Sequence, residues 1–213
     1  MALKRKKSLL ITFEGGEGSG KSKQVELFYP WFKCVYDSEA VVSREPGGDL
    51  VGERIRELLL NPEYKGMNPW SELFLFEAAR ASFYGNIVIP SLNSGKSVVL
   101  DRSLDSTTAY QAYGRKLDFE TIRRVNHFSI NERYPDLTFV INVDPEVGLA
   151  NRSKSGGVNR IDMENLEFHR RVNQGYVQIV MDGSPRFVLI PYVDGINKVQ
   201  ESIRKEFSER YLS

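Results

Sequence analysis

Residues 15–22 read Gly-Gly-Glu-Gly-Ser-Gly-Lys-Ser and match the phosphate-loop pattern G-x-x-x-x-G-K-S. An apolar run, residues 8–13, precedes this octapeptide, and a segment with helical spacing, residues 21–36, follows it. The pattern requires this order of strand, loop and helix. The octapeptide therefore predicts a strand that leads through a glycine-rich turn into a helix whose N-terminus binds polyphosphate.

The glycines of this loop allow backbone N–H groups to turn toward phosphate oxygens. Lys21 is expected to place a positive charge near the β- and γ-phosphates of ATP, and the Ser22 hydroxyl to bind Mg²⁺. The alternative is a glycine-rich turn that binds no ligand. The loop residues expected to bind ATP are Gly15, Gly16, Glu17, Gly18, Ser19, Gly20, Lys21 and Ser22.

Further short apolar runs occur at residues 40–43, 97–100, 137–143 and 187–190. The segments between them are long enough for helices, and this alternation predicts an α/β fold with a five-stranded parallel sheet flanked by helices on both faces. Residues 70–84 are apolar nearly all round and predict a buried helix. Pro30 lies inside the first predicted helix, so we expect that helix to bend or to be interrupted there.

The chain has 213 residues, of which 41% are hydrophobic, and this suits a single domain spanning residues 1–213. The loosest stretch, residues 153–157, is too short to separate two domains. Its glycines suit a mobile loop that closes over ATP, so we expect a lid around residues 151–162.

Charge and cysteine content favour a cytoplasmic protein. Lys and Arg number 29 against 28 Asp and Glu, so no overall field attracts nucleic acid or a membrane surface. The apolar runs fall short of the roughly 18 residues that span a membrane. Cys34 is the single cysteine, and no apolar stretch of signal-peptide length follows the basic residues 4–7. Those basic residues are expected to form a solvated tail, with an address or a phosphate-binding arm as the alternatives.

Charged side chains follow two of the predicted strands, at the carboxyl edge where parallel sheets bind ligands. Asp101 ends one of the runs and is expected to contact Mg²⁺ through water; the alternative is a helix cap. Arg44 and Arg102 each follow a strand closely, and their guanidinium groups suit a monophosphate dianion. The alternative for both arginines is an ion pair with surface acids.

Several short motifs follow one another along the chain in a characteristic order. They are the loop 15–22, Arg-Glu-Pro-Gly-Gly at 44–48, Phe-Glu-Ala-Ala-Arg at 76–80, Asp-Arg-Ser at 101–103, Ser-Thr-Thr-Ala-Tyr-Gln at 106–111, and the segment 135–146. In this ordered set the chain resembles the thymidylate kinases, a family of P-loop nucleoside monophosphate kinases, over most of its length. The resemblance implies a P-loop NTPase fold, transfer of the γ-phosphoryl group of ATP to dTMP to give dTDP and ADP, a need for Mg²⁺, and a homodimer.

The resemblance also suggests how the base is read. Phe76 and Arg80 are four residues apart, so they project from one helix face. A pyrimidine would stack on Phe76 while Arg80 donates to its O4 carbonyl, which excludes cytosine because the cytosine amino group is itself a donor. Without the other motifs, Phe76 would be a core residue and Arg80 part of a surface ion pair. By resemblance, Thr107 and Gln111 contact the base edge and Tyr110 crowds the 2′ carbon of the sugar.

The remaining site residues are also implied by the resemblance. Arg44 and Arg102 hold the acceptor phosphate, Pro46 and Arg56 lie nearby, and the Glu45–Pro46 peptide bond is cis. Glu17 matches a carboxylate near the sugar 3′-hydroxyl or the phosphate-binding arginines; its alternative is a loop acid that faces solvent.

A catalytic arginine is expected on the lid, because Gly18 occupies the loop position where one branch of the family carries it. Arg160 matches the functional lid arginine and is expected to bridge the donor and acceptor phosphates, whereas Arg152 is expected to contact ATP. The alternative is a solvated basic loop that only attracts ATP. The expected catalytic residues are Lys21, Arg102, Arg160 and Glu17.

Two other functions compete with this interpretation. A deoxynucleoside kinase would accept a sugar hydroxyl, but the arginine-bearing segment 44–48 suits a monophosphate. A non-enzymatic nucleotide-binding switch would have no need for the motifs at 76–80 and 101–111.

Overall fold

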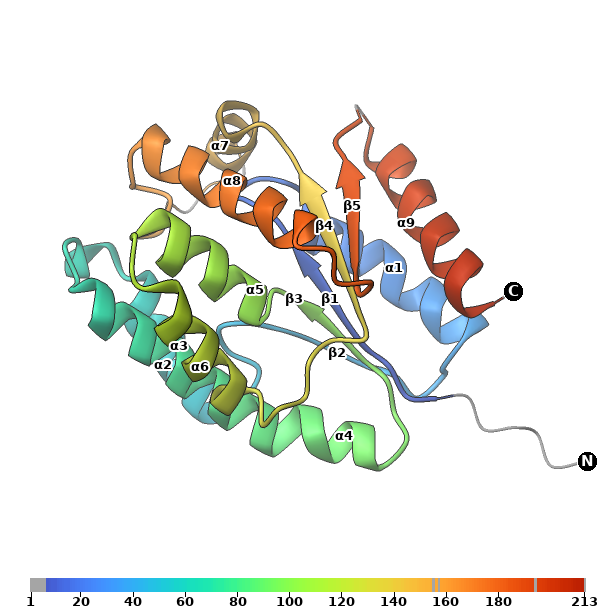
Figure 1. Ribbon diagram of the computed structural model, residues 1–213. Helices are drawn as coiled ribbons and strands as arrows, with labels where there is room; N and C mark the ends of the chain where they lie inside the picture. Colours follow the sequence, from blue (N-terminus) through green and yellow to red (C-terminus); the bar gives the residue numbers. More distant parts are fainter. Residues whose placement is uncertain (1–6, 155, 157, 194, 213) are drawn as a thin grey trace, which may run out of the picture.

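The computed structural model of the chain describes residues 7–154, 156, 158–193 and 195–212 (Figure 1). Its strands are β1 (Leu10–Glu14), β2 (Val41–Arg44), β3 (Val98–Asp101), β4 (Leu137–Asn142) and β5 (Phe187–Pro191). Its α-helices are α1 (Lys21–Val35), α2 (Leu50–Leu60), α3 (Pro69–Phe83), α4 (Ile89–Asn93), α5 (Leu104–Thr107), α6 (Phe119–Ser129), α7 (Pro145–Lys154), α8 (Leu166–Met181) and α9 (Ile196–Tyr211). Shorter turns are the 3₁₀ segment η1 (Pro62–Tyr64) and the π-helical segments η2 (Tyr84–Val88) and η3 (Thr108–Gly114).

The strands form a parallel sheet with the order β2-β3-β1-β4-β5. β1 lies in the centre, where Ile11 pairs with Val99 of β3 and with Leu137 of β4. Each strand overlaps one of the predicted apolar runs, so the predicted five-stranded α/β fold is confirmed. Because β2, β3 and β1 are neighbours, their carboxyl ends bring Arg44, Asp101 and the phosphate loop to one edge of the sheet.

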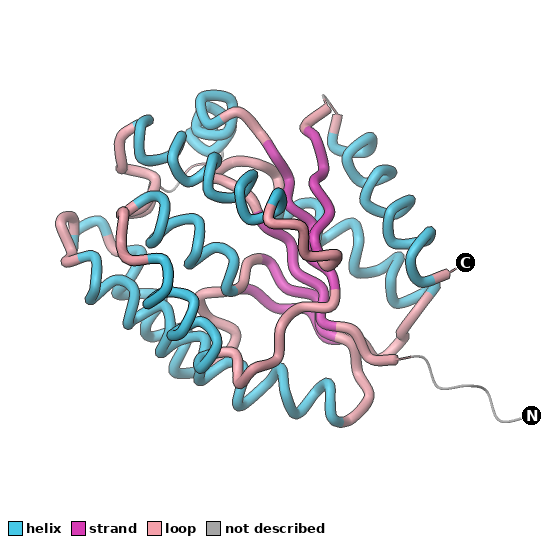
Figure 2. Tube along the Cα trace, in the orientation of Figure 1, coloured by secondary structure: helices cyan, strands magenta, loops and turns pink. Residues whose placement is uncertain are grey.

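Side chains of β1 alternate between the two faces of the sheet, as a strand requires. Ile11 and Phe13 join a core with Phe28 of α1 and Phe207 of α9, whereas Leu10 packs in a separate core with α3, η2 and β3. Figure 2 shows these helices on opposite sides of the strands. The ring of Phe28 lies edge-to-face with Phe13 at a centroid distance of 5.3 Å. Burial of each such ring contributes roughly 1.5–3 kcal/mol to stability.

The first helix runs without interruption through Pro30. A proline removes the hydrogen bond to the carbonyl four residues earlier, here that of Glu26. Both residues are exposed, so water can hydrate the freed carbonyl and the helix continues on its buried face. The sequence predicts that the helix either bends or is interrupted at Pro30, and the predicted interruption is wrong.

The apolar composition of α3 predicted a buried helix, but one side of the helix is exposed. Its inner face carries Glu72, Glu77 and Arg80, whereas Phe74 is 56% exposed and Trp70 is 37% exposed. The charged residues can be buried because they pair with one another and with neighbouring segments. The apolar residues left outside give α3 an aromatic outer surface.

Two further predictions concern the lid and the basic tail. Ser153 and Lys154 are the last residues of α7 rather than part of a loop, while residues 155 and 157 of the expected lid and residues 4–6 of the basic tail lie outside the described residues. Among the helices of the described residues, none has the length and apolar composition needed to cross a lipid bilayer.

Candidate active site

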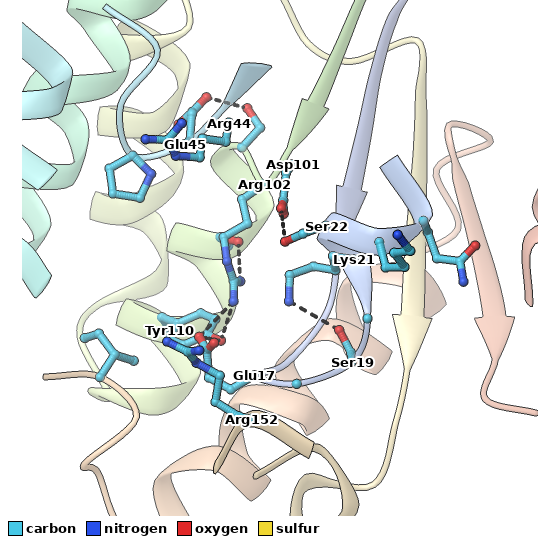
Figure 3. Close-up of a pocket in the computed structure, with 18 of the residues that line it drawn as sticks. Glu17, Ser19, Lys21, Ser22, Arg44, Glu45, Asp101, Arg102, Tyr110 and Arg152 are labelled. Atoms are coloured by element: carbon cyan, nitrogen blue, oxygen red, sulfur yellow. Dashed lines mark hydrogen bonds and ion pairs between the residues drawn. The ribbon is translucent and has the colours of Figure 1, made fainter. Parts of the chain in front are cut away.

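A cavity of about 910 Å³ lies at the carboxyl edge of the sheet and brings together most of the predicted site residues (Figure 3). Gly15, Gly16 and Arg160 are not among its lining residues. The predicted residues that line it are Glu17, Gly18, Ser19, Gly20, Lys21, Ser22, Arg44, Pro46, Arg56, Phe76, Arg80, Asp101, Arg102, Thr107, Tyr110, Gln111 and Arg152.

The phosphate loop ends at the N-terminus of α1. Gly20 occupies the cap position with φ 88°, a left-handed conformation that favours glycine, and no side chain caps the helix. The first N–H groups of α1 are thereby left for an anion. Lys21 folds back over the loop, where its Nζ donates to the carbonyl of Gly16 at 2.7 Å and to Ser19 Oγ at 3.2 Å.

Lys21 has an unusual ionisation equilibrium. Burial and the positive charge of Arg102 lower the pKa of Lys21 to about 8, although Glu17 and Asp101 oppose the shift. Figure 3 shows the Lys21 amino group and the Arg102 guanidinium on the same side of the loop. Two cations held close together in a buried site favour binding of an anion between them.

This pKa predicts the pH dependence of nucleotide capture. Lys21 is charged below pH 8 and loses its charge above it, so kcat/KM for ATP should fall as pH rises through about 8. At saturating ATP the bound phosphates hold the proton on Lys21, so kcat should stay level over the same interval. Initial rates between pH 6.5 and 9.5 measure both profiles. A level kcat/KM up to pH 9.5 would contradict the proposed role of charged Lys21 in ATP binding.

Asp101 and Ser22 form an oxygen pair at the entrance to the loop. The Ser22 hydroxyl donates to Asp101 Oδ2 at 2.5 Å. Asp101 Oδ1 is buried and meets no hydrogen-bond donor among the described residues. A hydroxyl beside a carboxylate with an unsatisfied oxygen is a donor set that fits Mg²⁺, which prefers oxygen ligands and keeps several waters.

Arg102 lies at the centre of the site. Its Nη2 donates to Glu17 Oε1 at 2.8 Å and to the hydroxyl of Tyr110 at 3.2 Å, and the Tyr110 hydroxyl itself donates to Glu17 at 2.7 Å. Burial alone would raise the pKa of Glu17, but Arg102 and Lys21 outweigh it and lower that pKa to about 2. Arg102 directly follows β3 and has φ 71°, a backbone conformation that non-glycine residues rarely adopt.

Sequence reasoning missed a group of residues behind Arg102. Glu14 is fully buried at the end of β1 and accepts from the Ser103 backbone N–H at 2.7 Å, the Ser106 hydroxyl at 2.6 Å and the Tyr176 hydroxyl at 3.1 Å. Burial and the nearby Asp105 raise the pKa of Glu14 to about 7. Arg102 Nη1 in turn donates to Ser106 and Tyr176. The sequence signal that could have indicated Glu14 is an acidic residue at the end of an apolar strand.

Arg80 is only 2% exposed, although it lines the cavity. Its Nε donates to Glu45 at 2.7 Å and its Nη1 to Glu77 at 2.5 Å. The other contacts go to Asn126, to the Ser103 carbonyl and to Thr107 Oγ1. Since a guanidinium has five N–H groups, these contacts account for all of them. Arg80 can donate to a base carbonyl only by giving up one of these partners, of which the Ser103 carbonyl at 3.3 Å is the most distant.

Two further arginines lie on the β2 side of the cavity. Arg44 Nη2 contacts both carboxylate oxygens of Glu53, at 3.1 and 3.0 Å, and its side chain is half exposed. Arg56 Nη1 donates to the Pro46 carbonyl at 2.8 Å. The Glu45–Pro46 bond is cis, as predicted.

The two lid arginines occupy different environments. Arg152 lines the cavity, and its Nε contacts Asp162 Oδ2 at 3.1 Å. Arg160 is buried away from the cavity, where Nη1 contacts Glu72 at 2.6 Å and Nε donates to the Leu59 carbonyl at 2.8 Å. A contact between Arg160 and the phosphates would therefore require its guanidinium to leave a buried carboxylate, and the bridging role of Arg160 stays a prediction.

The position of Arg152 follows from a close approach of two glycines. Gly18 has φ +64°, and a Cβ atom there would lie 1.8 Å from the carbonyl oxygen of Gly148 in α7. A Cβ atom at Gly148 would in turn lie 2.3 Å from the Glu17 carbonyl oxygen. The missing side chains thus let α7 pack directly on the phosphate loop, and Arg152 lies one turn further along that helix.

Comparison with known proteins identifies the family. Residues 13–203 match the family model described as thymidylate kinase. The chain is 38% identical over 208 residues to thymidylate kinases of Bacillus thuringiensis (strain Al Hakam) and Bacillus cereus (strain Q1), an alignment that covers 97% of this chain and 100% of each relative. The crystal structure of thymidylate kinase from Ehrlichia chaffeensis matches with a TM-score of 0.78 and 35% identity, over 94% of this chain and 98% of that one. The chain belongs to the thymidylate kinase family.

Proposed function

We propose that this chain is an ATP-dependent dTMP kinase, which transfers the γ-phosphoryl group of ATP to dTMP and yields dTDP and ADP. The observation that carries the proposal is one cavity lined at one end by the phosphate loop and elsewhere by Arg44, Arg102, Phe76 and Gln111. Such a cavity offers cationic groups for two phosphates and an aromatic ring with an amide for a base.

Catalysis in this site consists of positioning and charge neutralisation. Phosphoryl transfer requires little covalent chemistry from the protein, and a monophosphate with a second pKa near 6 is already a nucleophile at neutral pH. Lys21 and the N-terminus of α1 hold the donor phosphates, while Arg102, held by Glu17 and Tyr110, fixes the acceptor phosphate. Ser22 and Asp101 would hold Mg²⁺, which when bound neutralises charge on the β- and γ-oxygens.

The nucleoside half of the acceptor is bound by α3 and η3. Phe76 on α3 is partly buried and lines the cavity, and it would stack on the pyrimidine. Tyr110 packs beside Arg102 and would crowd the 2′ position of the sugar. Thr107 and Gln111 also line the cavity and would contact the base edge.

The segment 151–162 would act as the lid of a single domain, and Arg152 rather than Arg160 would place positive charge between the donor and acceptor phosphates. Support for this assignment comes from the cavity, which Arg152 lines, and from the direct packing of α7 on the phosphate loop. Water would be excluded when the lid closes, which strengthens each charge interaction inside the site.

A second copy of the chain is the expected partner, and the proposal is supported by an apolar outer surface on three neighbouring helices. α2 packs on α3, and α3 packs on α6. The exposed large hydrophobic residues of these helices are Leu50, Val51, Leu58, Trp70, Phe74, Phe119 and Phe128. Large apolar side chains left exposed on neighbouring helices would pack against the second copy.

The acceptor specificity tests the proposed function. In a coupled assay for ADP formation, dTMP should support turnover, whereas thymidine should give a rate at least about 10³-fold lower because Arg44 and Arg102 would have no phosphate to bind. Faster turnover with thymidine would identify a deoxynucleoside kinase. ATP binding without turnover of either acceptor would indicate a nucleotide-binding protein that is not an enzyme.

A further inference from the structure

Glu72 occupies a buried position that the proposed function does not use. It lies in the first turn of α3, its side chain is 0% exposed, and both carboxylate oxygens accept hydrogen bonds from other segments. Oε1 accepts from Gln111 Nε2 at 2.9 Å and from Arg115 Nε at 2.9 Å. Oε2 accepts from Arg115 Nη2 at 2.9 Å and from Arg160 Nη1 at 2.6 Å. The carboxylate is therefore held at both oxygens.

This arrangement decides which way the Gln111 amide is oriented. An ionised carboxylate only accepts hydrogen bonds, so the NH₂ group of Gln111 must face Glu72. The pKa of Glu72 is lowered because Arg115 and Arg160 outweigh the effect of its burial, and the carboxylate stays ionised. Gln111 is 1% exposed and lines the cavity. The amide oxygen is then the polar atom that Gln111 offers to a ligand.

We propose that Glu72 is a positioning residue that sets the base selectivity of the site by fixing the Gln111 amide with its oxygen as an acceptor for a ring N–H. The proposal rests on the proposed function, since it takes the ligand to be a pyrimidine monophosphate. Thymine and uracil carry a hydrogen on ring nitrogen 3, which this oxygen would accept. Cytosine has a lone pair at that position, and the two acceptors would repel each other.

The surroundings of Glu72 explain why a carboxylate is suited to this task. Arg115 is held by Glu164 at 2.7 Å in addition to Glu72, and Arg160 is held by the Leu59 carbonyl. The two guanidinium groups thus keep the Glu72 carboxylate from rotating. An amide at position 72 would present a donor on one side, and Gln111 could then turn over and direct its NH₂ group into the cavity.

This selectivity acts separately from Arg80. Arg80 contacts Glu45, Glu77 and Thr107 and makes no contact with Glu72 or Gln111 among the hydrogen bonds of the described residues. Recognition of the base by Gln111 therefore requires no rearrangement of the Arg80 cluster, whereas donation by Arg80 to a carbonyl does. The two residues would read different atoms of the base.

The test compares kcat/KM for dTMP, dUMP and dCMP in the wild type, Glu72→Gln and Glu164→Gln. Glu72→Gln should lower the preference for dTMP and dUMP over dCMP by about tenfold or more, because one hydrogen bond and one repulsion are lost. Glu164→Gln removes a carboxylate from the same arginine without touching Gln111, so it should keep the wild-type preference. A folded Glu72→Gln protein with the wild-type preference would overturn the proposal.

A cycle with Gln111→Leu tests whether Glu72 acts through Gln111. In that background Glu72→Gln should cause no further loss of preference, and an additive loss would overturn the proposal. If Glu72→Gln does not fold, Glu72→Asp keeps the charge while shortening the reach, and it should lose the same preference.

The wild type provides a measurement that needs no variant at this position. Inhibition by N3-methyl-dTMP should be at least about tenfold weaker than binding of dTMP, because the methyl group replaces the ring N–H. Equal binding would overturn the proposal. A wild-type protein inactive with dTMP would instead contradict the proposed function, so the two failures are distinguishable.

Discussion

Replacing Arg152 by methionine should lower kcat by about 10²–10³ with a much smaller effect on KM for ATP, since charge between the two phosphates is needed mainly in the transition state. Arg152 lines the cavity at the end of α7, the helix that packs on the phosphate loop. Single-turnover transfer at saturating ATP and dTMP measures the chemical step directly.

The matched control is Lys154→Met, which removes an exposed basic residue from the same helix outside the cavity and should leave kcat within about twofold. Arg160→Met should mainly lower the melting temperature, because it leaves the buried Glu72 with one cation fewer. A loss in kcat from Arg160→Met that exceeds that of Arg152→Met would return the catalytic role to Arg160. A raised KM for ATP with kcat intact in both would indicate that the basic segment only attracts ATP.

Replacing Arg80 by leucine should destabilise the protein by about 3–5 kcal/mol, because it leaves the buried carboxylates of Glu45 and Glu77 without their cation. For a chain of this size that corresponds to a decrease in melting temperature of roughly 6–20 °C. Thermal or urea denaturation measures the loss. Adding Glu45→Gln and Glu77→Gln to the Arg80→Leu protein should recover a large part of it, since no unpaired charge would then be buried.

A surface pair with the same sequence spacing provides the control. Arg54 contacts Glu57 at 3.1 Å, but both side chains are mostly exposed, so Arg54→Leu should change stability by less than about 1 kcal/mol. Equal losses for Arg54→Leu and Arg80→Leu would contradict the importance of burial. Activity measured only on the folded fraction of Arg80→Leu would further show whether discrimination between dTMP and dCMP is lost.

The penalty in Arg80→Leu should also depend on pH. Burial raises the pKa of Glu45 even with Arg80 present, and removal of that cation would raise it further. The folded variant would then bind more protons than the unfolded chain, so its stability should increase as pH falls toward 6. This is opposite to the usual acid destabilisation of paired carboxylates.

The strands and the phosphate loop could be predicted from the sequence because their signals are local. Buried strands of a parallel sheet read as short apolar runs, and the loop pattern places Lys21 and Ser22 at the start of α1. Asp101, which ends β3, and Arg102, which follows it, could be placed at the carboxyl edge from the same reasoning.

Pairings between distant segments could not be predicted in this way. Nothing in the local spacing indicates that Arg160 is engaged by Glu72, and a match to a family motif therefore assigned Arg160 to the cavity. The apolar composition of α3 gives no indication of ion pairs, yet its acidic residues Glu72 and Glu77 are buried with arginines. The role of Glu14 depends on Tyr176, which comes from α8.

The contact between Gly18 and Gly148 restricts how a protein of this architecture can change its source of catalytic charge. Any side chain at position 18 would collide with the α7 backbone and would also have to adopt a left-handed φ of +64°. An arginine introduced there would displace the same helix that carries Arg152. Supply of the charge by the loop and supply by α7 are therefore mutually exclusive, and a switch between them requires the loop and the helix to be redesigned together rather than one residue to be exchanged.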